Sequence, residues 1–310
     1  MISYIEKPHS KQDLTSILNP KIKAWFFRKF KEFSLPQLYG VLEIHKRNNI
    51  LISAPTGATK TLTAFLSILN ELINLSEKNK LENKVYCIYV SPLKALNNDV
   101  EKNLREPLQQ IETLANKKLN IKVAVRTGDT TASEKQKMLK DPPHILITTP
   151  ESLAIILSSI KFKELVKDVK WVIVDEIHAL ANNKRGVHLS LSLERLQKLN
   201  DFIRIGLSAT ISPLEEIAKF LVGYEDGKVR NCKIVNVQFI KDMDLKVISP
   251  LPDLINTTHE EMHSSMYNLI DNLIQEHKTT LIFTNTRSAT ERVVDYLKNE
   301  FPKNYTENIG

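Results

Sequence analysis

The sequence contains few of the residues on which disulfide frameworks and thiolate metal sites depend. Only Cys87 and Cys232 are present among 310 residues, which excludes a disulfide network and any metal site built on several cysteines. No apolar stretch reaches the roughly 18–20 residues that a membrane helix needs, and the N-terminal MISYIEKPHSKQ lacks the apolar segment of a secretory signal. We therefore expect a protein of the reducing cytoplasm that has no membrane-bound part.

Glycine is scarce as well, with 8 residues in 310 against a usual share of about 7%, so each glycine is more informative than usual. The other composition figures, 42% hydrophobic and 25% charged residues, are ordinary for a globular protein long enough for about two domains. The formal net charge is +7. This excess is compatible with a partner that has a phosphate backbone, and equally with an ordinary lysine-rich surface.

Short runs rich in valine and isoleucine alternate with helical patterns over most of the chain. The runs occupy residues 49–54, 84–90, 121–126, 144–148, 171–174 and 204–207. They do not alternate between apolar and polar positions, which is typical of strands buried on both faces of a parallel sheet. Between them, residues 61–75 and 190–199 repeat apolar side chains at the three- and four-residue spacing of one helix face. The sequence thus predicts an α/β fold with a doubly wound parallel sheet.

The pattern changes beyond residue 225. Residues 231–249 have the β-branched composition of extended chain, and Pro250 and Pro252 interrupt it. A helix over 260–276, a strand over 280–284 and a helix over 289–301 are predicted next. We expect a helical lead-in over 1–36, a first domain over 37–230, a linker over 231–259, and the beginning of an incomplete second domain over 260–310.

The segment 54–61, APTGATKT, follows the first predicted strand directly and precedes a predicted helix. This is the context of a phosphate-binding loop, whose backbone N–H groups and helix N-terminus cradle phosphates; the ATP-binding candidates are Thr56, Gly57, Ala58, Thr59, Lys60 and Thr61. Lys60 would reach the β- and γ-phosphates, and the Thr61 hydroxyl would bind Mg²⁺. Thr59 stands where the usual motif has glycine, and its branched side chain would crowd the phosphates. The alternative interpretation is a Pro-Gly turn followed by a helix-capping threonine.

The tetrad Asp175-Glu176-Ile177-His178 follows another predicted strand, at the strand end where ligands bind in open α/β sheets. Asp175 would position Mg²⁺, and Glu176 would orient the attacking water, so Lys60, Asp175 and Glu176 are the catalytic candidates. The alternative is a polar strand end with a capping aspartate. Further along, the hydroxyls of Ser208 and Thr210 could hydrogen bond to this tetrad and couple to His178, or could cap a helix from Ile211.

Together these segments resemble superfamily 2 helicases of the DEAD/DEAH type. Their amino-acid sequences are most similar to those of the large helicase-related (Lhr) family of DNA helicases. The matching stretches, in the family's order, are SAPTGATKT (53–61), YVSPLKALNND (89–99), RTGDT (126–130), TTPESL (148–153), DEIHAL (175–180), NKRGVHLSLSLERL (183–196), LSATI (207–211) and TLIFTNTRSATERV (280–293). The resemblance implies RecA-like domains, ATP and Mg²⁺ as cofactors, and translocation on single-stranded or tailed duplex DNA; an RNA partner is also compatible. The family's later motifs, including the arginines that reach the γ-phosphate from the second domain, are absent.

The resemblance also implies roles for individual residues. Gln37 matches the glutamine that reads adenine, although a surface glutamine is the alternative. The nucleic-acid-binding candidates are Ser91, Pro92, Lys94, Arg126, Thr127, Gly128, Thr149, Pro150, Glu151 and Arg185. All of them except Arg185 lie at the ends of successive strands, so one edge of the sheet would track one nucleic-acid strand through phosphate contacts. Arg185 matches a further loop that nears the DNA. A non-catalytic nucleic-acid-binding fragment with weak ATP binding, and a nucleotide-regulated protein unrelated to DNA, are the rival interpretations.

Overall fold

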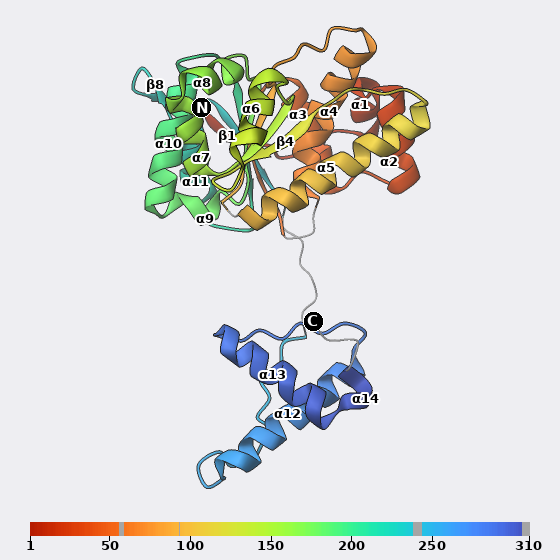
Figure 1. Cartoon of the computed structure of the whole chain (residues 1–310), viewed down its shortest axis with the longest axis vertical. Coiled ribbons are helices and arrows are strands. Elements are labelled where there is room, and N and C mark those ends of the chain that lie inside the picture. The colour runs from red at the N-terminus through yellow and green to blue at the C-terminus, as the bar shows by residue number, and fades with distance from the viewer. Residues whose placement is uncertain (56–58, 93, 238–243, 306–310) are drawn as a thin grey trace. The chain divides into compact units, whose positions relative to one another are not determined.

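The chain forms two units in the computed structural model, Met1–Ile240 and Lys241–Gly310 (Figure 1). The structure describes residues 1–55, 59–92, 94–237 and 244–305, with the side chains of residues 94–99 and 303 outside this description. Each unit is considered by itself below.

The first unit is built on a parallel sheet in the order β1-β10-β2-β7-β6-β3-β5-β4. Its strands are β1 (Ile2–Tyr4), β2 (Ile50–Ser53), β3 (Cys87–Val90), β4 (Val123–Arg126), β5 (Ile145–Thr148), β6 (Trp171–Val174), β7 (Ile203–Ser208) and β10 (Cys232–Asn236). Every residue of β2, β3, β5, β6 and β7 is buried. The predicted α/β fold with a parallel sheet is confirmed, because continuous Val- and Ile-rich strands are stable only where helices cover both faces.

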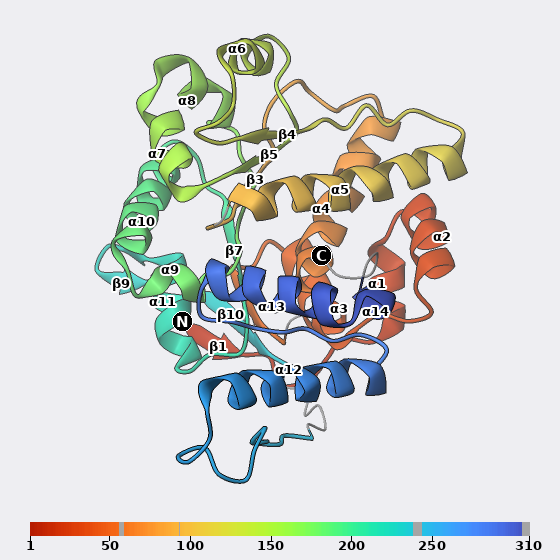
Figure 2. The same cartoon turned by 60° about the horizontal axis from the view of Figure 1, so that its bottom comes forward.

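Helices from two consecutive parts of the chain cover the two faces of the sheet (Figures 1 and 2). One core cluster joins the sheet to α1 (Lys11–Ile17), α2 (Pro20–Lys29), α3 (Leu35–His45), α4 (Lys60–Glu77) and α5 (Lys94–Ala115). The other joins it to α6 (Ala132–Lys140), α7 (Pro150–Ser158), α8 (Ile160–Val166), α9 (His178–Ala181), α10 (Lys184–Gln197) and α11 (Leu214–Val222). The helix predicted over 61–75 is thus present within α4, and the helix predicted over 190–199 overlaps the second half of α10, which ends at Gln197.

The structure differs from the predicted domain boundaries at both ends of the first domain. Residues 231–259 were expected to be a linker, but β10, near the start of this segment, lies within the sheet between β1 and β2. The first unit therefore extends to Ile240 instead of ending at residue 230. At the other end, the expected helical lead-in contains α1 and α2 but also β1, which pairs with β10. A short hairpin of β8 (Tyr224–Glu225) and β9 (Lys228–Val229) precedes β10.

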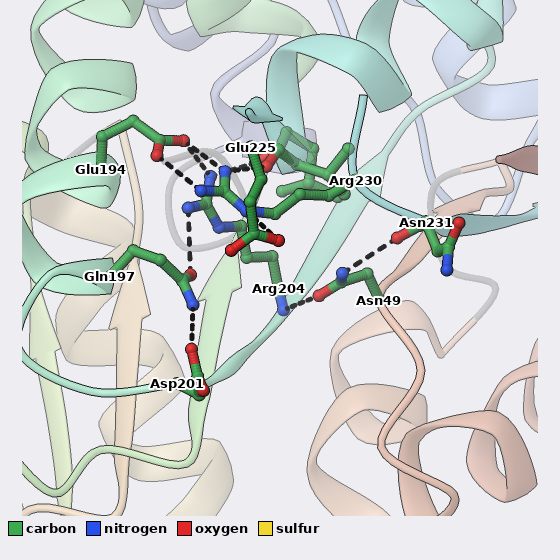
Figure 3. A network of polar contacts seen from close by, with 10 residues as sticks. Asn49, Glu194, Gln197, Asp201, Arg204, Glu225, Arg230 and Asn231 are labelled. Carbon is green, nitrogen blue, oxygen red and sulfur yellow. Dashed lines mark hydrogen bonds and ion pairs between the residues drawn. The ribbon is translucent and has the colours of Figure 1, made fainter. Parts of the chain in front are cut away.

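An ion-pair network fastens the amino-terminal end of β7 to its neighbours (Figure 3). Arg204 is 1% exposed, and its guanidinium donates to Glu194 Oε1 at 3.0 Å and to Gln197 Oε1 at 3.1 Å, both on α10. Arg230, which precedes β10, donates to both carboxylate oxygens of Glu194, at 2.8 and 3.0 Å. Glu194 therefore compensates two arginines at the end of β7 opposite to Ser208.

The second unit contains α12 (His259–Glu276), α13 (Arg287–Glu300) and α14 (Pro302–Tyr305). Helices α12 and α13 pack side by side through Tyr267 and Tyr296, whose rings stack with centroids 3.9 Å apart (Figure 2). The strand predicted over 280–284 is wrong, since these residues form no strand and the described part of this unit offers no strand to pair with. The assignment of residues 260–310 to a second RecA-like domain stays a prediction.

Candidate functional site

The candidate residues from six strands lie in one row along the carboxyl-terminal edge of the sheet. Parallel registers align the ends of neighbouring strands: Ser53 pairs with Ser208, and Val90 pairs with both Val174 and Thr148. The order β2-β7-β6-β3-β5-β4 therefore places the phosphate-loop segment, Ser208 and Asp175 on one half of the edge. On the other half, Ser91 and Thr149 follow β3 and β5, and Arg126 is the last residue of β4.

Lys60 begins α4 immediately after the loop and is 8% exposed. Its ammonium donates to the backbone oxygens of Ala54 at 2.7 Å and Pro55 at 3.0 Å. Burial lowers the pKa of Lys60, and the nearby carboxylates of Glu176 and Asp175 oppose that shift. Lys60 is thus held over the loop within the field of both acidic candidates. Thr56, Gly57 and Ala58 lie outside the described residues.

Thr59 adopts a left-handed conformation, with φ 58° and ψ 26°, at the N-terminus of α4. This explains why a glycine is usual at this position of the loop, since only glycine adopts positive φ without a steric cost. The Thr59 hydroxyl lies 2.7 Å from Ser34 Oγ and accepts from Gln37 Nε2 at 3.4 Å. The threonine side chain therefore joins the loop to the start of α3.

Gln37 itself is 1% exposed. Its side-chain oxygen accepts from the backbone N–H of Ser34 at 2.9 Å, as part of the capping box that begins α3. The structure thus places Gln37 beside the loop, as an adenine-reading residue requires, while its amide is engaged with protein atoms. Adenine recognition by Gln37 stays a prediction.

Asp175 follows β6 and is 8% exposed. The Tyr89 hydroxyl donates to its Oδ2, and the backbone N–H of Glu176 donates to its Oδ1 at 2.8 Å. Burial raises the pKa of Asp175, and the hydrogen bond from Tyr89 opposes this effect. The carboxylate of this proposed Mg²⁺ ligand is therefore held by a buried tyrosine on one oxygen and by the backbone on the other.

Glu176 and His178 connect this acidic centre to the end of β7. Glu176 is left-handed at φ 46°, and its Oε2 lies 3.3 Å from His178 Nε2. His178 Nδ1 accepts from the backbone N–H of Ala209 at 3.3 Å and lies 3.3 Å from Ser208 Oγ. In the neutral ring the proton is then on Nε2 and faces Glu176.

Thr210 is exposed and makes no hydrogen bond to the tetrad within the described part of the chain. The helix that follows starts only at Leu214, so Ser208 and Thr210 do not cap a helix from Ile211. Ser208 is the hydroxyl that meets His178, which is the contact expected of a coupling residue. The coupling roles of His178, Ser208 and Thr210 stay predictions.

The other half of the edge is formed by mostly buried residues whose backbones are tied together. The Ser91 N–H donates to Thr148 O at 3.0 Å, and the Thr148 hydroxyl donates to Arg126 O at 2.7 Å. Thr149 caps α7, Pro150 is its first residue, and Thr127 is likewise buried, whereas Gly128 is exposed. Lys94 begins α5, and its side chain lies outside the description.

Arg126 is 5% exposed, and its guanidinium stacks 3.5 Å from the centre of the Phe162 ring. Its buried Nη1 has no hydrogen-bond partner among the described residues. Burial lowers the pKa of Arg126. The side chain thus contributes a desolvated positive charge beneath the loop, rather than an extended arm at the surface.

Arg185 links three of the predicted nucleic-acid-binding segments. Its guanidinium donates to Glu151 Oε1 at 2.6 Å and Oε2 at 3.3 Å, and to Pro92 O at 2.7 Å. Because the Glu151 carboxylate already neutralises this arginine, the geometry favours a role in holding the two loops together. Direct contact of Arg185 or Glu151 with nucleic acid stays a prediction.

A divalent cation at this site would need the phosphates of a nucleotide as further ligands. The described residues contain no cluster of three or more His, Cys, Asp or Glu side chains that could hold a metal alone. A threonine hydroxyl and a carboxylate are hard oxygen ligands, and Mg²⁺ in nucleotide sites commonly takes one or two protein ligands with phosphates and water. Thr61 and Asp175 therefore fit magnesium.

Sequence reasoning missed Tyr89 and Ser34. Tyr89 occupies a buried strand position, where an aromatic residue normally signals only core packing. Ser34 is a helix-capping residue that also contacts Thr59. No nearby sequence pattern predicts the contact of Tyr89 with Asp175 or that of Ser34 with Thr59, because each contact joins segments separated by 25 residues or more in sequence.

Comparisons with known protein families and sequences match this chain to helicases. A family model described as DEAD/DEAH box helicase matches residues 35–219. The ATP-dependent helicase Lhr-Core of Methanocaldococcus jannaschii is 60% identical over 302 residues, which cover 96% of this chain and 35% of that protein. The Lhr-Core helicase of Methanothermobacter thermautotrophicus is 54% identical over 311 residues, covering 99% of this chain and 36% of that protein.

The fold has solved counterparts as well. The structure of Mycobacterium smegmatis helicase Lhr bound to ssDNA and AMP-PNP superposes with a TM-score of 0.79 at 38% identity, over 93% of this chain and 36% of that one. The DEAD-box helicase Mss116 bound to ssRNA and UDP-BeF shares the fold, with a TM-score of 0.72 at 19% identity. The chain spans about a third of the length of the Lhr-Core relatives. No helix among the described residues is long and apolar enough to cross a membrane.

Proposed function

The chain belongs to the DEAD/DEAH box helicase family, and from this premise we propose that it binds ATP with Mg²⁺ and single-stranded DNA on one edge of its sheet and hydrolyses ATP there. The observation that carries the proposal is the strand order. It separates the acidic and phosphate-loop residues from the loops after β3, β5 and β4, yet keeps both groups on the same edge. In the longer relatives, we infer, this arrangement serves ATP-dependent translocation.

On the half of the sheet edge that contains the phosphate-loop segment and Asp175, we assign each residue its own role in ATP binding or hydrolysis. Lys60 would neutralise the β- and γ-phosphates, and Thr61 and Asp175 would hold Mg²⁺, which when bound neutralises charge on the transferring phosphoryl group. Glu176 would orient the attacking water and accept its proton. His178 lies between Glu176 and the end of β7, so it would transmit the state of the site to Ser208.

The nucleic-acid half is supported by the backbone and by charge. Ser91 and Thr149 follow adjacent strands, and Arg185 fastens the loops that contain Pro92 and Glu151. Contacts from such loops are to phosphates, which position a strand without reading its bases. The relative of Mycobacterium smegmatis carries ssDNA in its solved structure, which favours DNA over RNA.

The test is phosphate release by the 310-residue chain with and without single-stranded DNA. We expect slow hydrolysis that DNA stimulates. Glu176→Gln should abolish hydrolysis but retain nucleotide binding, and Lys60→Ala should lose both. Hydrolysis that survives in Glu176→Gln, or the absence of any ATP binding, would contradict the proposed activity.

The nucleic-acid-binding half is tested by the fluorescence anisotropy of labelled oligo-dT and oligo-rU between roughly 50 and 200 mM salt, because phosphate contacts lose affinity steeply across this range. Lys94→Ala should weaken binding to all sequences equally. Lys228→Ala is the control, since this exposed lysine lies in the hairpin after α11. A flat salt response or a strong base preference would overturn the phosphate-tracking interpretation.

A further inference from the structure

Tyr89 is completely buried on β3, directly beneath the acidic centre. It pairs in register with Ile173 on β6, two residues before Asp175. Its ring stacks on Phe65 of α4 with centroids 5.5 Å apart and an interplanar angle of 24°. The tyrosine is therefore fixed between the strand that ends in Asp175 and the helix that begins at Lys60.

The hydroxyl of this tyrosine donates to Asp175 Oδ2, and Asp175 is one of the two residues proposed to hold Mg²⁺. A buried tyrosine hydroxyl needs a partner, but one backbone carbonyl would satisfy it. Here the partner is instead the carboxylate of a proposed metal ligand, which follows the neighbouring strand β6.

The Asp175 carboxylate is consequently held at both oxygens. Oδ2 accepts from Tyr89, and Oδ1 accepts from the Glu176 N–H at 2.8 Å. Each carboxylate oxygen keeps lone-pair capacity after one hydrogen bond. The carboxylate is thus fixed in orientation while still able to serve a cation.

We infer that Tyr89 is a positioning residue of the Mg²⁺–ATP site, whose hydroxyl holds the Asp175 carboxylate in the orientation that receives the metal. The inference rests on the proposed function. Hydrogen-bond partners behind metal ligands typically change metal affinity about 10–100-fold when removed. Tyr89 supplies that hydrogen bond here for Asp175.

The experiment compares Tyr89→Phe with Tyr86→Phe. Both changes remove one hydroxyl from a buried tyrosine, but Tyr86 precedes β3 and its hydroxyl accepts from the Glu82 N–H, at the opposite end of the strand. The probe is a fluorescent ATP analogue, and its affinity is measured in EDTA and across a Mg²⁺ titration. Direct Mn²⁺ binding to the nucleotide complex, followed by electron paramagnetic resonance, gives a second readout that does not depend on activity.

We expect Tyr89→Phe to bind the nucleotide like the wild type in EDTA and to need about tenfold more Mg²⁺ or Mn²⁺, whereas Tyr86→Phe keeps the wild-type requirement. An unchanged metal requirement in Tyr89→Phe, or an equal change in Tyr86→Phe, would overturn the role of Tyr89 alone. If the wild-type chain binds no nucleotide, the proposed function fails as well.

Retention of the ring stack on Phe65 favours normal folding of Tyr89→Phe, which thermal denaturation checks. Should that variant not fold, 4-fluorophenylalanine at position 89 keeps the ring and fills the volume of the hydroxyl with a fluorine that cannot donate a hydrogen bond, so the metal requirement should still rise. An unchanged requirement there would overturn the inference in the same way.

Discussion

At the scale of the residue, the described site contains two non-glycine positions in the left-handed region, Thr59 and Glu176. Among the seven such positions in the described chain, Thr59 alone is β-branched. A non-glycine residue held there costs of the order of 1–3 kcal/mol. The contacts of Thr59 with Ser34 and Gln37 offset part of that cost.

Replacement of Thr59 should separate these effects. We expect Thr59→Gly to bind Mg²⁺–ATP about tenfold more tightly, equivalent to ~1.4 kcal/mol, because the loop loses both the Cβ and the positive-φ cost. Thr59→Ala should fall between glycine and threonine, since it keeps the Cβ and loses the hydroxyl contacts. Calorimetric titration measures all three affinities. Equal or weaker binding in Thr59→Gly would show that the threonine does not crowd the phosphates.

The sequence predicts the site best where the chemistry demands a residue type. Lys60, Asp175 and Glu176 stand at strand ends in a recognisable order, and the structure brings Lys60 within the field of both acids. Contacts such as Tyr89 to Asp175 cannot be predicted in this way. They depend on which strands become neighbours, and β3 and β6 lie 86 residues apart at this bond.

At the scale of the element, Glu194 on α10 holds β7 and the segment before β10 together. Glu194→Gln would leave the almost fully buried Arg204 without a negative partner. Breaking a fully buried pair costs about 3–5 kcal/mol, and because Glu194 is itself 34% exposed we expect about 2 kcal/mol. Urea denaturation measures this loss in the free energy of unfolding.

The control is Glu164→Gln, which removes an exposed carboxylate paired with Lys167 and should change stability little. Nucleotide affinity should be unchanged in Glu194→Gln, because the network lies at the end of β7 opposite to Ser208. Equal denaturation midpoints for the two variants would show that the buried arginines do not depend on Glu194.

The strands at the centre of the sheet are predictable because they are apolar on both faces. β10 is not, because residues 232–236 have the same β-branched composition whether they form a linker or a strand. Only pairing with β1 and β2 decides between the two. Residues 280–284 are the opposite case. Their sequence favours a strand, but no strand forms there because the described chain offers them no partner strand.

At the scale of the whole molecule, the first unit contains both halves of the edge for which we propose nucleotide and DNA binding, whereas the second contributes three helices and no strand among the described residues. In phosphoryl-transfer enzymes, an arginine brought to the γ-phosphate accelerates hydrolysis roughly 10³–10⁵-fold. Beyond Arg230, the sequence contains only Arg287 and Arg292, both within the stretch 280–293. Motor action also needs a second domain that closes on ATP and grips the strand.

We therefore expect the 310-residue chain by itself to bind DNA and hydrolyse ATP slowly but to displace no strand. The matched relatives are about three times as long, and the coupling of hydrolysis to movement is expected to need what they contain in addition. A strand-displacement assay on a 3′-tailed duplex with Mg²⁺ and ATP measures this, with a full-length Lhr-Core relative as the positive control. Robust ATP-dependent displacement by the 310-residue chain, lost in Glu176→Gln, would show that the first unit and three further helices suffice for a motor.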